Sequence, residues 1–320
     1  PFLMKGMKEA VKRINRAKSQ NESILLFGDY DVDGTSAVSM MYTFFKDQNI
    51  NVNYYVPDRY SEGYGFSKQG IDYAFNQKNS LIITLDCGIR AVQQTTYANS
   101  KNIDVIICDH HNVAEELPNA ISILNPKQPD CLYPNKYLSG CGVGFKFISA
   151  YSIHNNIKKE ETYKYLDLLA LSLIADIMSL TGENRVYTFY GLKKINQNPC
   201  VGLKALINLL SKNNLIKSSD ISFGIAPLIN AAGRMSHATN AVKLLIESNA
   251  QEAEVYAEIL YENNNDRREV EKEITKQALE MIDDKMHTSV VSSTNWHKGV
   301  VGIVASKLLE KYYKPTIVFV

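Results

Sequence analysis

The 320-residue chain has little cysteine, no long apolar run and almost no net charge. Its five cysteines form no CxxC pair, so neither a disulfide framework nor a thiolate zinc site is indicated. No run reaches the roughly 18 apolar residues of a membrane span, and residues 1–5 lack the apolar core of a signal peptide. These absences predict a cytoplasmic protein without membrane association.

The near-neutral composition also limits how the chain can bind nucleic acid. A net charge of +1 is not typical of a protein that coats nucleic acid along its length. Any site for a polyanion must therefore be local, with a basic lining set against an acidic surface elsewhere.

What the sequence does contain is a dense acidic stretch directly after the apolar run 24–27. Asp29, Asp31 and Asp33 alternate along it, and in an extended segment their side chains would face the same way. Carboxylates that close repel one another unless a cation lies among them, and hard divalent cations prefer carboxylate oxygens. The alternative is a solvated, aspartate-rich turn between a strand and a helix.

Apolar runs alternate with helical patterns through the first 139 residues. This alternation predicts βαβ units and a parallel α/β sheet. We expect helices at 4–18, 35–46, 67–76 and up to about residue 99, and strands at 24–27, 51–56, 81–85, 104–108 and 121–124.

Acidic and imidazole residues follow three of the predicted strands. Asp86 comes after the third strand, and Asp109, His110 and His111 come directly after the fourth. Because the carboxyl ends of parallel strands lie along one edge of a sheet, we expect these side chains to join the aspartates of residues 29–33. The alternative for the histidine pair is a surface turn with one imidazole buried.

From residue 140 the pattern becomes helical, with helices expected at 143–155, 160–179, 184–196, 201–212 and 219–231. Asp176 lies in the most apolar of these, where a carboxylate is costly unless a cation or hydrogen bonds receive it. It is either a structural acid that faces a backbone amide or a further metal ligand, and we prefer the metal ligand. Gly233 and Arg234 are expected in a small-residue turn after a helix, where the arginine either binds a phosphate or is an ordinary surface residue.

The last section of the sequence predicts a connecting helix and a second, smaller α/β unit. Its Gly-rich loop at 296–305 opens a helix and presents backbone amides to an anion, and His297 and Lys298 favour phosphate. The chain ends inside an apolar run, so we expect this unit to be truncated. The predicted organisation is a catalytic domain at 1–248 (a sheet region at 1–139 and a helical region at 140–248), a connecting helix at 249–285 and an incomplete domain at 286–320.

The predicted site has carboxylate and imidazole ligands without thiolate, which suits Mn²⁺ or Mg²⁺ better than structural zinc. Two such ions that share a carboxylate generate a hydroxide and stabilise both ends of an in-line displacement at phosphorus. The predicted reaction class is therefore phosphoester hydrolysis.

These motifs resemble those of the DHH phosphoesterase family. The family is named for the sequence Asp109-His110-His111, and residues 28–34, residues 86–88 and Asp176 resemble its first, second and fourth motifs. Residues 57–65, 230–234 and 297–305 match as well, the last resembling the start of the DHH-associated domain, so the resemblance covers essentially the whole chain. Phe27 stands where the pyrophosphatase branch of the family carries a histidine, which argues against that branch.

The resemblance is closest to the family's exonucleases, and it implies hydrolysis of single-stranded DNA from 5′ to 3′ into 5′-mononucleotides, in DNA repair and recombination. His111 would contact the scissile phosphate or assist the leaving oxygen, Asp109 would belong to the catalytic set, and Arg234 would clamp the phosphate. Two Mn²⁺ or Mg²⁺ ions would be held by Asp31, Asp33, Asp86, His110 and Asp176, with Asp29 in support. The other implied substrate contacts are Arg59, Tyr64, Asn230, His297, Gly299 and Gly302.

The resemblance also implies binding partners, and two alternative functions remain open. Single-stranded DNA would be the substrate, a single-strand-binding protein and a helicase are candidate partners, and the chain would act as a monomer. One alternative is a DHH phosphodiesterase for short oligoribonucleotides, cyclic dinucleotides or adenosine bisphosphate. The other is a metal-free replication scaffold related to the family.

Overall fold

The computed structural model describes residues 1–210, 215–283 and 285–320. Its first half is built on an all-parallel sheet with the strand order β2-β1-β3-β4-β5. Each strand lies within two residues of its predicted position, so the predicted parallel α/β architecture is confirmed. The strands are β1 (Ser23–Gly28), β2 (Val52–Tyr55), β3 (Asn79–Leu85), β4 (Asp104–Cys108) and β5 (Ser122–Leu124).

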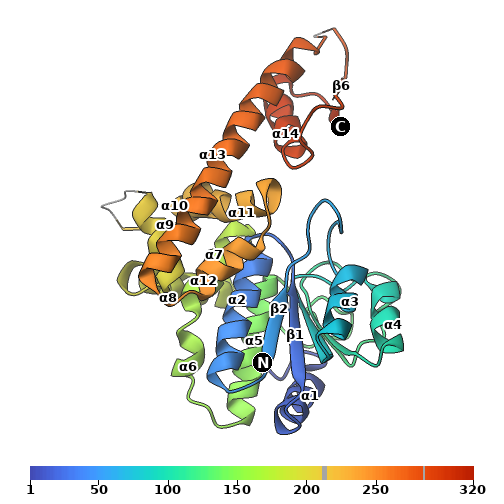
Figure 1. Cartoon of the computed structure of the whole chain (residues 1–320), viewed down its shortest axis with the longest axis vertical. Helices are drawn as coiled ribbons and strands as arrows, with labels where there is room; N and C mark the ends of the chain where they lie inside the picture. The colour runs from blue at the N-terminus through green and yellow to red at the C-terminus, as the bar shows by residue number, and fades with distance from the viewer. Residues whose placement is uncertain (211–214, 284) are drawn as a thin grey trace.

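Helices cover both faces of this sheet, because parallel strands are buried on both sides. Alternate residues of β1 belong to two different apolar cores: Ile24 and Leu26 face one core, and Leu25 and Phe27 face the other. The first core also contains α1 (Met7–Ser19), α2 (Val32–Asp47) and α5 (Gly140–His154), and the second contains α3 (Lys68–Asn76) and α4 (Val92–Ser100) (Figure 1).

The helical half continues the first core but differs in detail from the prediction. The single helix expected at 160–179 is wrong: it is divided into two helices and ends at Ala175, where Ile177 takes a left-handed conformation with φ of 54°. Residues 211–212 of the predicted helix 201–212 lie outside the described residues. The helices are α6 (Glu160–Tyr163), α7 (Leu166–Ala175), α8 (Gly182–Gln197), α9 (Val201–Leu209) and α10 (Ser218–Asp220).

The segment after α10 also corrects the sequence prediction. A short π-helix, η1 (Ile221–Ile225), leads into α11 (Ala226–Met235), and a further helix that was not predicted follows, α12 (Thr239–Ile246). Gly233 and Arg234 therefore lie in the last turn of α11 and not in a turn after a helix. The helix extends this far because its small and apolar residues pack into the core, for example Ala231 and Ala232.

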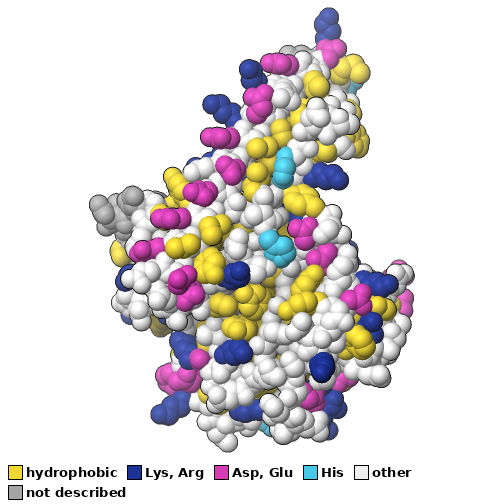
Figure 2. Space-filling view, in the orientation of Figure 1, with side chains coloured by type: hydrophobic (Ala, Val, Ile, Leu, Met, Phe, Trp, Pro, Cys, Tyr) yellow, Lys and Arg dark blue, Asp and Glu magenta, His cyan; other side chains and the backbone are white. Residues whose placement is uncertain are grey.

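The long helix α13 (Ala250–Glu280) carries the end of the chain away from the sheet (Figure 1). Asn249 caps it by accepting hydrogen bonds from the amides of Gln251 and Glu252. Acidic and basic side chains are spread along its outer surface (Figure 2), as expected for a solvated face. Residue 284 of the predicted connecting helix 249–285 lies outside the described residues.

At the far end of α13 lies a small C-terminal lobe, which we define as residues 289–319. It contains β6 (Ser289–Ser292), α14 (Val301–Tyr312) and β7 (Thr316–Phe319), and β6 and β7 pair in parallel. Trp296, Val300 and Val304 of the lobe share an apolar core with Ile274 and Ala278 of α13. No helix in the described stretches of the chain combines the length and the apolar character that crossing a bilayer requires.

Candidate metal centre

The acidic stretch after β1 forms a junction between a strand and a helix. The prediction of an extended segment is wrong here, because α2 begins at Val32: Asp31 caps this helix through the amide of Gly34, at 3.0 Å, and Asp33 lies in its first turn. The first turn folds tightly against Asp29, since a Cβ on Gly34 would lie 2.7 Å from the Asp29 backbone nitrogen. The three carboxylates still converge, but the turn between strand and helix brings them together.

Asp33 is held by the start of another helix. Its carboxylate accepts hydrogen bonds from the amides of Gly140 (2.6 Å) and Cys141 (2.8 Å) at the N-terminus of α5, and from the Ser172 hydroxyl (2.6 Å) on α7. Free amides and the positive end of the helix dipole favour a carboxylate at this place. Asp33 thereby ties the acidic junction to two helices that are distant in sequence.

Asp86 follows β3 directly and adopts a left-handed backbone conformation, with φ of 62°. This conformation is uncommon for a residue other than glycine, and it costs about 1–3 kcal/mol unless the surroundings fix it. α5 begins against it, because a Cβ on Gly140 would lie 2.7 Å from the Asp86 Cα. In this conformation the Asp86 carboxylate lies 3.1 Å from His110, which follows the neighbouring strand β4.

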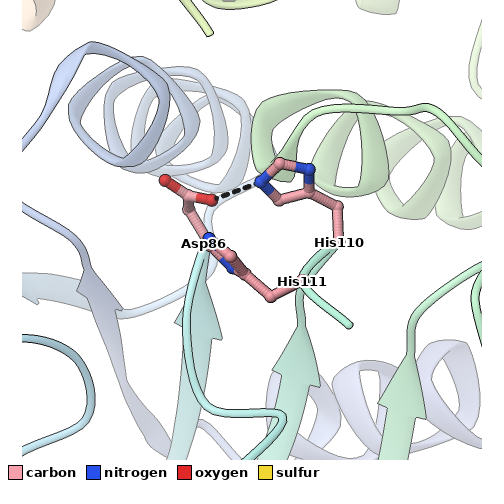
Figure 3. Close-up of side chains that lie close together, drawn as sticks. All are labelled: Asp86, His110 and His111. Carbon is pink, nitrogen blue, oxygen red and sulfur yellow. Dashed lines mark ion pairs between the residues drawn. The ribbon is translucent and has the colours of Figure 1, made fainter. Parts of the chain in front are cut away.

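His110 lies at the centre of the resulting cluster. Its Nε2 is 3.1 Å from Asp86 Oδ1 (Figure 3), 3.6 Å from Asp176 Oδ2 and 3.7 Å from Asp33 Oδ2. The expectation that strand-end residues gather at one edge of the sheet is thus confirmed. Three sets of ligand atoms lie within 4.8 Å of one another: Asp86, His110 and His111; Asp33, His110 and Asp176; and Asp29, Asp31 and Asp86.

Several atoms of this cluster lack hydrogen-bond partners. Asp29 Oδ1 and Asp176 Oδ2 are buried and accept no hydrogen bond among the described residues, and the nearest recorded neighbour of Asp86 Oδ1 is the His110 ring nitrogen at 3.1 Å. A buried carboxylate oxygen without a hydrogen bond is costly, so groups of this kind call for an explanation. Oxygen and imidazole ligands within a few ångströms of one another fit a divalent cation, which would satisfy them.

The pKa values of the carboxylates in the cluster also indicate a bound cation. Burial, reinforced by the charge of Asp31, raises the pKa of Asp29 to about 8, and burial with the charge of Asp33 raises the pKa of Asp176 to about 7. Burial and then Asp33 also raise the pKa of Asp86 well above its usual range. These carboxylates destabilise one another when all are ionised, and a bound cation would reverse that effect.

Asp109 belongs to none of the three sets of ligand atoms, and it binds the backbone amides of both histidines and the ring of His111. Its carboxylate accepts hydrogen bonds from the amides of Ile89 (2.9 Å) and His110 (2.7 Å), and it lies 2.7 Å from His111 Nδ1. That hydrogen bond raises the pKa of His111. Burial opposes the ionised form of Asp109, but its hydrogen bonds outweigh burial and lower its pKa. Asp109 therefore orients His111 rather than joining the metal-ligand sets.

The other nitrogen of His111 faces a loop that follows β2. His111 Nε2 lies 3.2 Å from the hydroxyl of Tyr64. In the same loop, the Arg59 guanidinium lies 5.0 Å from the centre of the Tyr30 ring, a cation–π contact beside the acidic junction. The structure thus brings Arg59, Tyr64 and His111 to the same side of the cluster.

The other residues predicted to contact the substrate lie in different parts of the structure. Asn230 accepts a hydrogen bond from the Val32 amide at 3.1 Å, so its side chain supports the acidic junction. Arg234 donates from Nη1 to the Gly299 carbonyl at 2.9 Å. Gly302 is exposed in the first turn of α14 with open space beside it, so steric crowding does not require glycine there.

Two residues of the site were missed by the sequence analysis. Ser172 binds Asp33, and its signal was a hydroxyl in a helix whose only other polar residue is Asp167. Tyr60 donates a hydrogen bond to the Arg234 carbonyl, and no sequence pattern distinguished it from the other tyrosines of the chain. Both contacts join segments that are more than a hundred residues apart.

The fold and the site together define an α/β protein with a candidate metal centre at the strand ends of a parallel sheet. The family model described as "DHH family, N-terminal domain" matches residues 23–173. The single-stranded-DNA-specific exonuclease RecJ of Bacillus subtilis is 41% identical over 323 residues, which cover 99% of this chain and 40% of that protein. Residues 23–173 therefore form an N-terminal domain of the DHH family, as the motifs in this region predict.

Solved structures agree with this assignment. A structure of exonuclease RecJ bound to manganese matches with a TM-score of 0.90 at 29% identity, over 99% of this chain and 80% of that one. A Thermus thermophilus RecJ structure in complex with Mg²⁺ matches with a TM-score of 0.78 at 28% identity, over 98% of this chain and 43% of that one. The chain spans 40% to 58% of the length of the first curated relatives it matches.

The contact between α5 and Asp86 gives a prediction. Gly140→Ala places a Cβ 2.7 Å from the Asp86 Cα, so we expect the free energy of unfolding in urea to fall by about 1–3 kcal/mol. Gly302→Ala, in open space within a helix, is the matched control and should be neutral or stabilising by about 0.5–1 kcal/mol. Equal effects of the two substitutions would contradict the packing described for Asp86.

Proposed function

We propose that this chain contains the catalytic region of a metal-dependent exonuclease that hydrolyses single-stranded DNA from its 5′ end and releases 5′-mononucleotides. The observation that carries the proposal is the buried cluster of carboxylates and imidazole at the strand ends, with arginines and a second histidine beside it. The RecJ names of its relatives support the substrate. We assign residues 1–248 to the catalytic domain, 249–285 to the connecting helix and 286–320 to the start of a DHH-associated domain.

Two Mn²⁺ or Mg²⁺ ions fit the cluster. Asp86 belongs to two of the three sets of ligand atoms, which supports its role as the shared carboxylate, and Asp29 lies close enough to Asp31 and Asp86 to support them. When bound, the ions would supply a water of lowered pKa and charge stabilisation at phosphorus. The proposed ligands are Asp31, Asp33, Asp86, His110 and Asp176.

His111 is suited to serve the leaving group. The hydrogen bond from Nδ1 to Asp109 fixes the ring and favours its protonated form, so Nε2 carries a proton toward the side of the cluster on which Tyr64 lies. A 3′-oxygen that leaves phosphorus at this place would receive that proton. Asp109 acts by orienting His111, because its own oxygens are occupied by backbone amides and by the ring.

The arginines would bind the phosphates of the strand. Arg234 uses Nη1 for the Gly299 carbonyl and can direct other donors of its guanidinium to a phosphate. Arg59 lies over the Tyr30 ring beside the acidic junction, a position that suits the 5′ end. Selectivity would then come from the shape of the passage and from stacking, and base readout would contribute little.

The cellular setting belongs to the same proposal. We propose that the protein acts as a monomer in the cytoplasm, in DNA repair and recombination. A helicase and a single-strand-binding protein would provide the exposed strand. Since the chain spans only a portion of its relatives, these statements concern the protein to which it belongs.

Metal binding gives a prediction that needs no activity. Adding Mn²⁺ to protein treated with EDTA should raise the midpoint of thermal unfolding, and at 100 times the Kd the stabilisation is about 2.7 kcal/mol. Asp86→Ala should remove most of this shift, whereas Asp130→Ala should retain it, because Asp130 is an exposed acid paired with Lys5. A full Mn²⁺ shift in Asp86→Ala would refute the proposed site.

The activity itself is tested with 5′-labelled oligonucleotides and Mn²⁺. We expect mononucleotide release from single-stranded DNA, with less from duplex DNA and from short oligoribonucleotides or cyclic dinucleotides. Asp86→Ala should reduce the rate by at least about 100-fold, because even outer-shell changes at metal sites cost 10- to 100-fold. Preferential hydrolysis of short RNA or cyclic dinucleotides would contradict the proposed substrate, but it would not contradict the proposed metal centre.

A further inference from the structure

Three distant segments meet where the C-terminal lobe approaches the rest of the molecule. The hydroxyl of Tyr60, in the loop after β2, donates to the main-chain carbonyl of Arg234 at the end of α11. The Arg234 guanidinium in turn donates from Nη1 to the carbonyl of Gly299, at 2.9 Å, just before α14. We call these three residues and His297 the latch.

The packing of the latch is close. The rings of Tyr60 and His297 meet edge to face with their centres 5.6 Å apart. A Cβ on Gly299 would lie 2.7 Å from the Arg234 carbonyl oxygen and 3.1 Å from His297 Cε1, and it would also strike the Tyr60 hydroxyl. Gly299 therefore lets the lobe approach to this distance, and any larger residue would hold it back.

The latch lies beside an apolar contact between the same regions of the molecule. Met235, the residue after Arg234, packs against the core that the lobe shares with α13. Tyr60 reaches this place from outside: its side chain is 44% exposed, and its loop also carries Arg59 and Tyr64. One tyrosine thus connects the loop beside the metal centre, the proposed phosphate clamp and the lobe.

We infer that Tyr60 is a positioning residue, which holds Arg234 in place and keeps the lobe against the loop beside the metal centre, so that a single strand stays bound between successive cleavages. This inference rests on the proposed function. The charges of the region agree with it: burial and then the nearby Arg59 and Arg267 lower the pKa of Arg234. Cations gathered in this way are stabilised by a polyanion such as a phosphate chain.

The latch makes a specific kinetic prediction. Tyr60→Phe keeps the ring and removes the hydrogen bond, so KM for a long single strand should rise by about 2- to 12-fold, the range expected for one lost hydrogen bond. The number of nucleotides released per binding event, measured with an excess of unlabelled trap DNA, should fall by a similar factor. kcat should change less than KM, because the contacts described for Tyr60 are to Arg234 and His297 and not to the metal-ligand sets.

A double-mutant cycle separates the latch from general packing. Gly299→Ala disrupts the same contact from the lobe side, so Tyr60→Phe combined with Gly299→Ala should raise KM no more than the worse single variant. Tyr137→Phe, a substitution of a 60% exposed tyrosine on the loop before α5, is the control and should match the wild type. Additive effects of Tyr60→Phe and Gly299→Ala would overturn the inference.

The latch can also be tested without substrate, so that the result does not depend on the proposed function. Amide hydrogen exchange of the unliganded protein should become faster in residues 57–65 and 297–303 of both Tyr60→Phe and Gly299→Ala, with the sheet unchanged. Wild-type exchange in Tyr60→Phe would refute the latch even if DNA is degraded. If exchange is faster in the two variants but the wild type does not hydrolyse DNA, the latch is supported and the nuclease assignment is overturned.

Discussion

The mutual repulsion of buried carboxylates at one edge of the sheet is the constraint on which the structure depends. Asp29, Asp31 and Asp86 bring ligand oxygens within 4.8 Å of one another in a region that water reaches poorly. Such a group raises the free energy of the folded chain unless protons or a cation neutralise it. The nearby imidazoles and orphaned oxygens indicate a cation, and the phosphoester chemistry proposed here follows from that requirement.

The fold maintains this cluster with backbone groups. The amides at the start of α5 receive Asp33, the end of β3 holds Asp86 in a left-handed conformation, and Asp31 caps α2. Each of these contacts involves a helix or strand that is packed in the core, so rigid elements position the proposed ligands. The loop with Tyr64 and Arg59 completes the site from its more exposed side.

The sequence predicted most of the sheet because buried parallel strands give continuous apolar runs, and the strand-end acids followed from topology alone. It placed Asp176 inside a helix because apolar composition does not reveal the left-handed Ile177 that ends α7. It missed α12 and the role of Ser172, since both depend on tertiary packing. The latch could not be predicted from the sequence either. Its hydrogen bonds are accepted by main-chain carbonyls, and every residue has such a carbonyl, so no pattern of side chains identifies the pairs.

The position of Asp33 determines whether a substitution there reduces stability as well as activity. Its carboxylate both borders the proposed ion site, 3.7 Å from His110 Nε2, and satisfies the first amides of α5, most of whose residues are buried. Losing it leaves those amides without partners, so stability and chemistry decline together. The Asp176 side chain is 30% exposed, and within the described residues its Oδ2 accepts no hydrogen bond, so losing it leaves no helix amide without a partner. A genetic screen for inactive alleles should therefore recover poorly accumulating proteins at the first position and abundant, inert ones at the second.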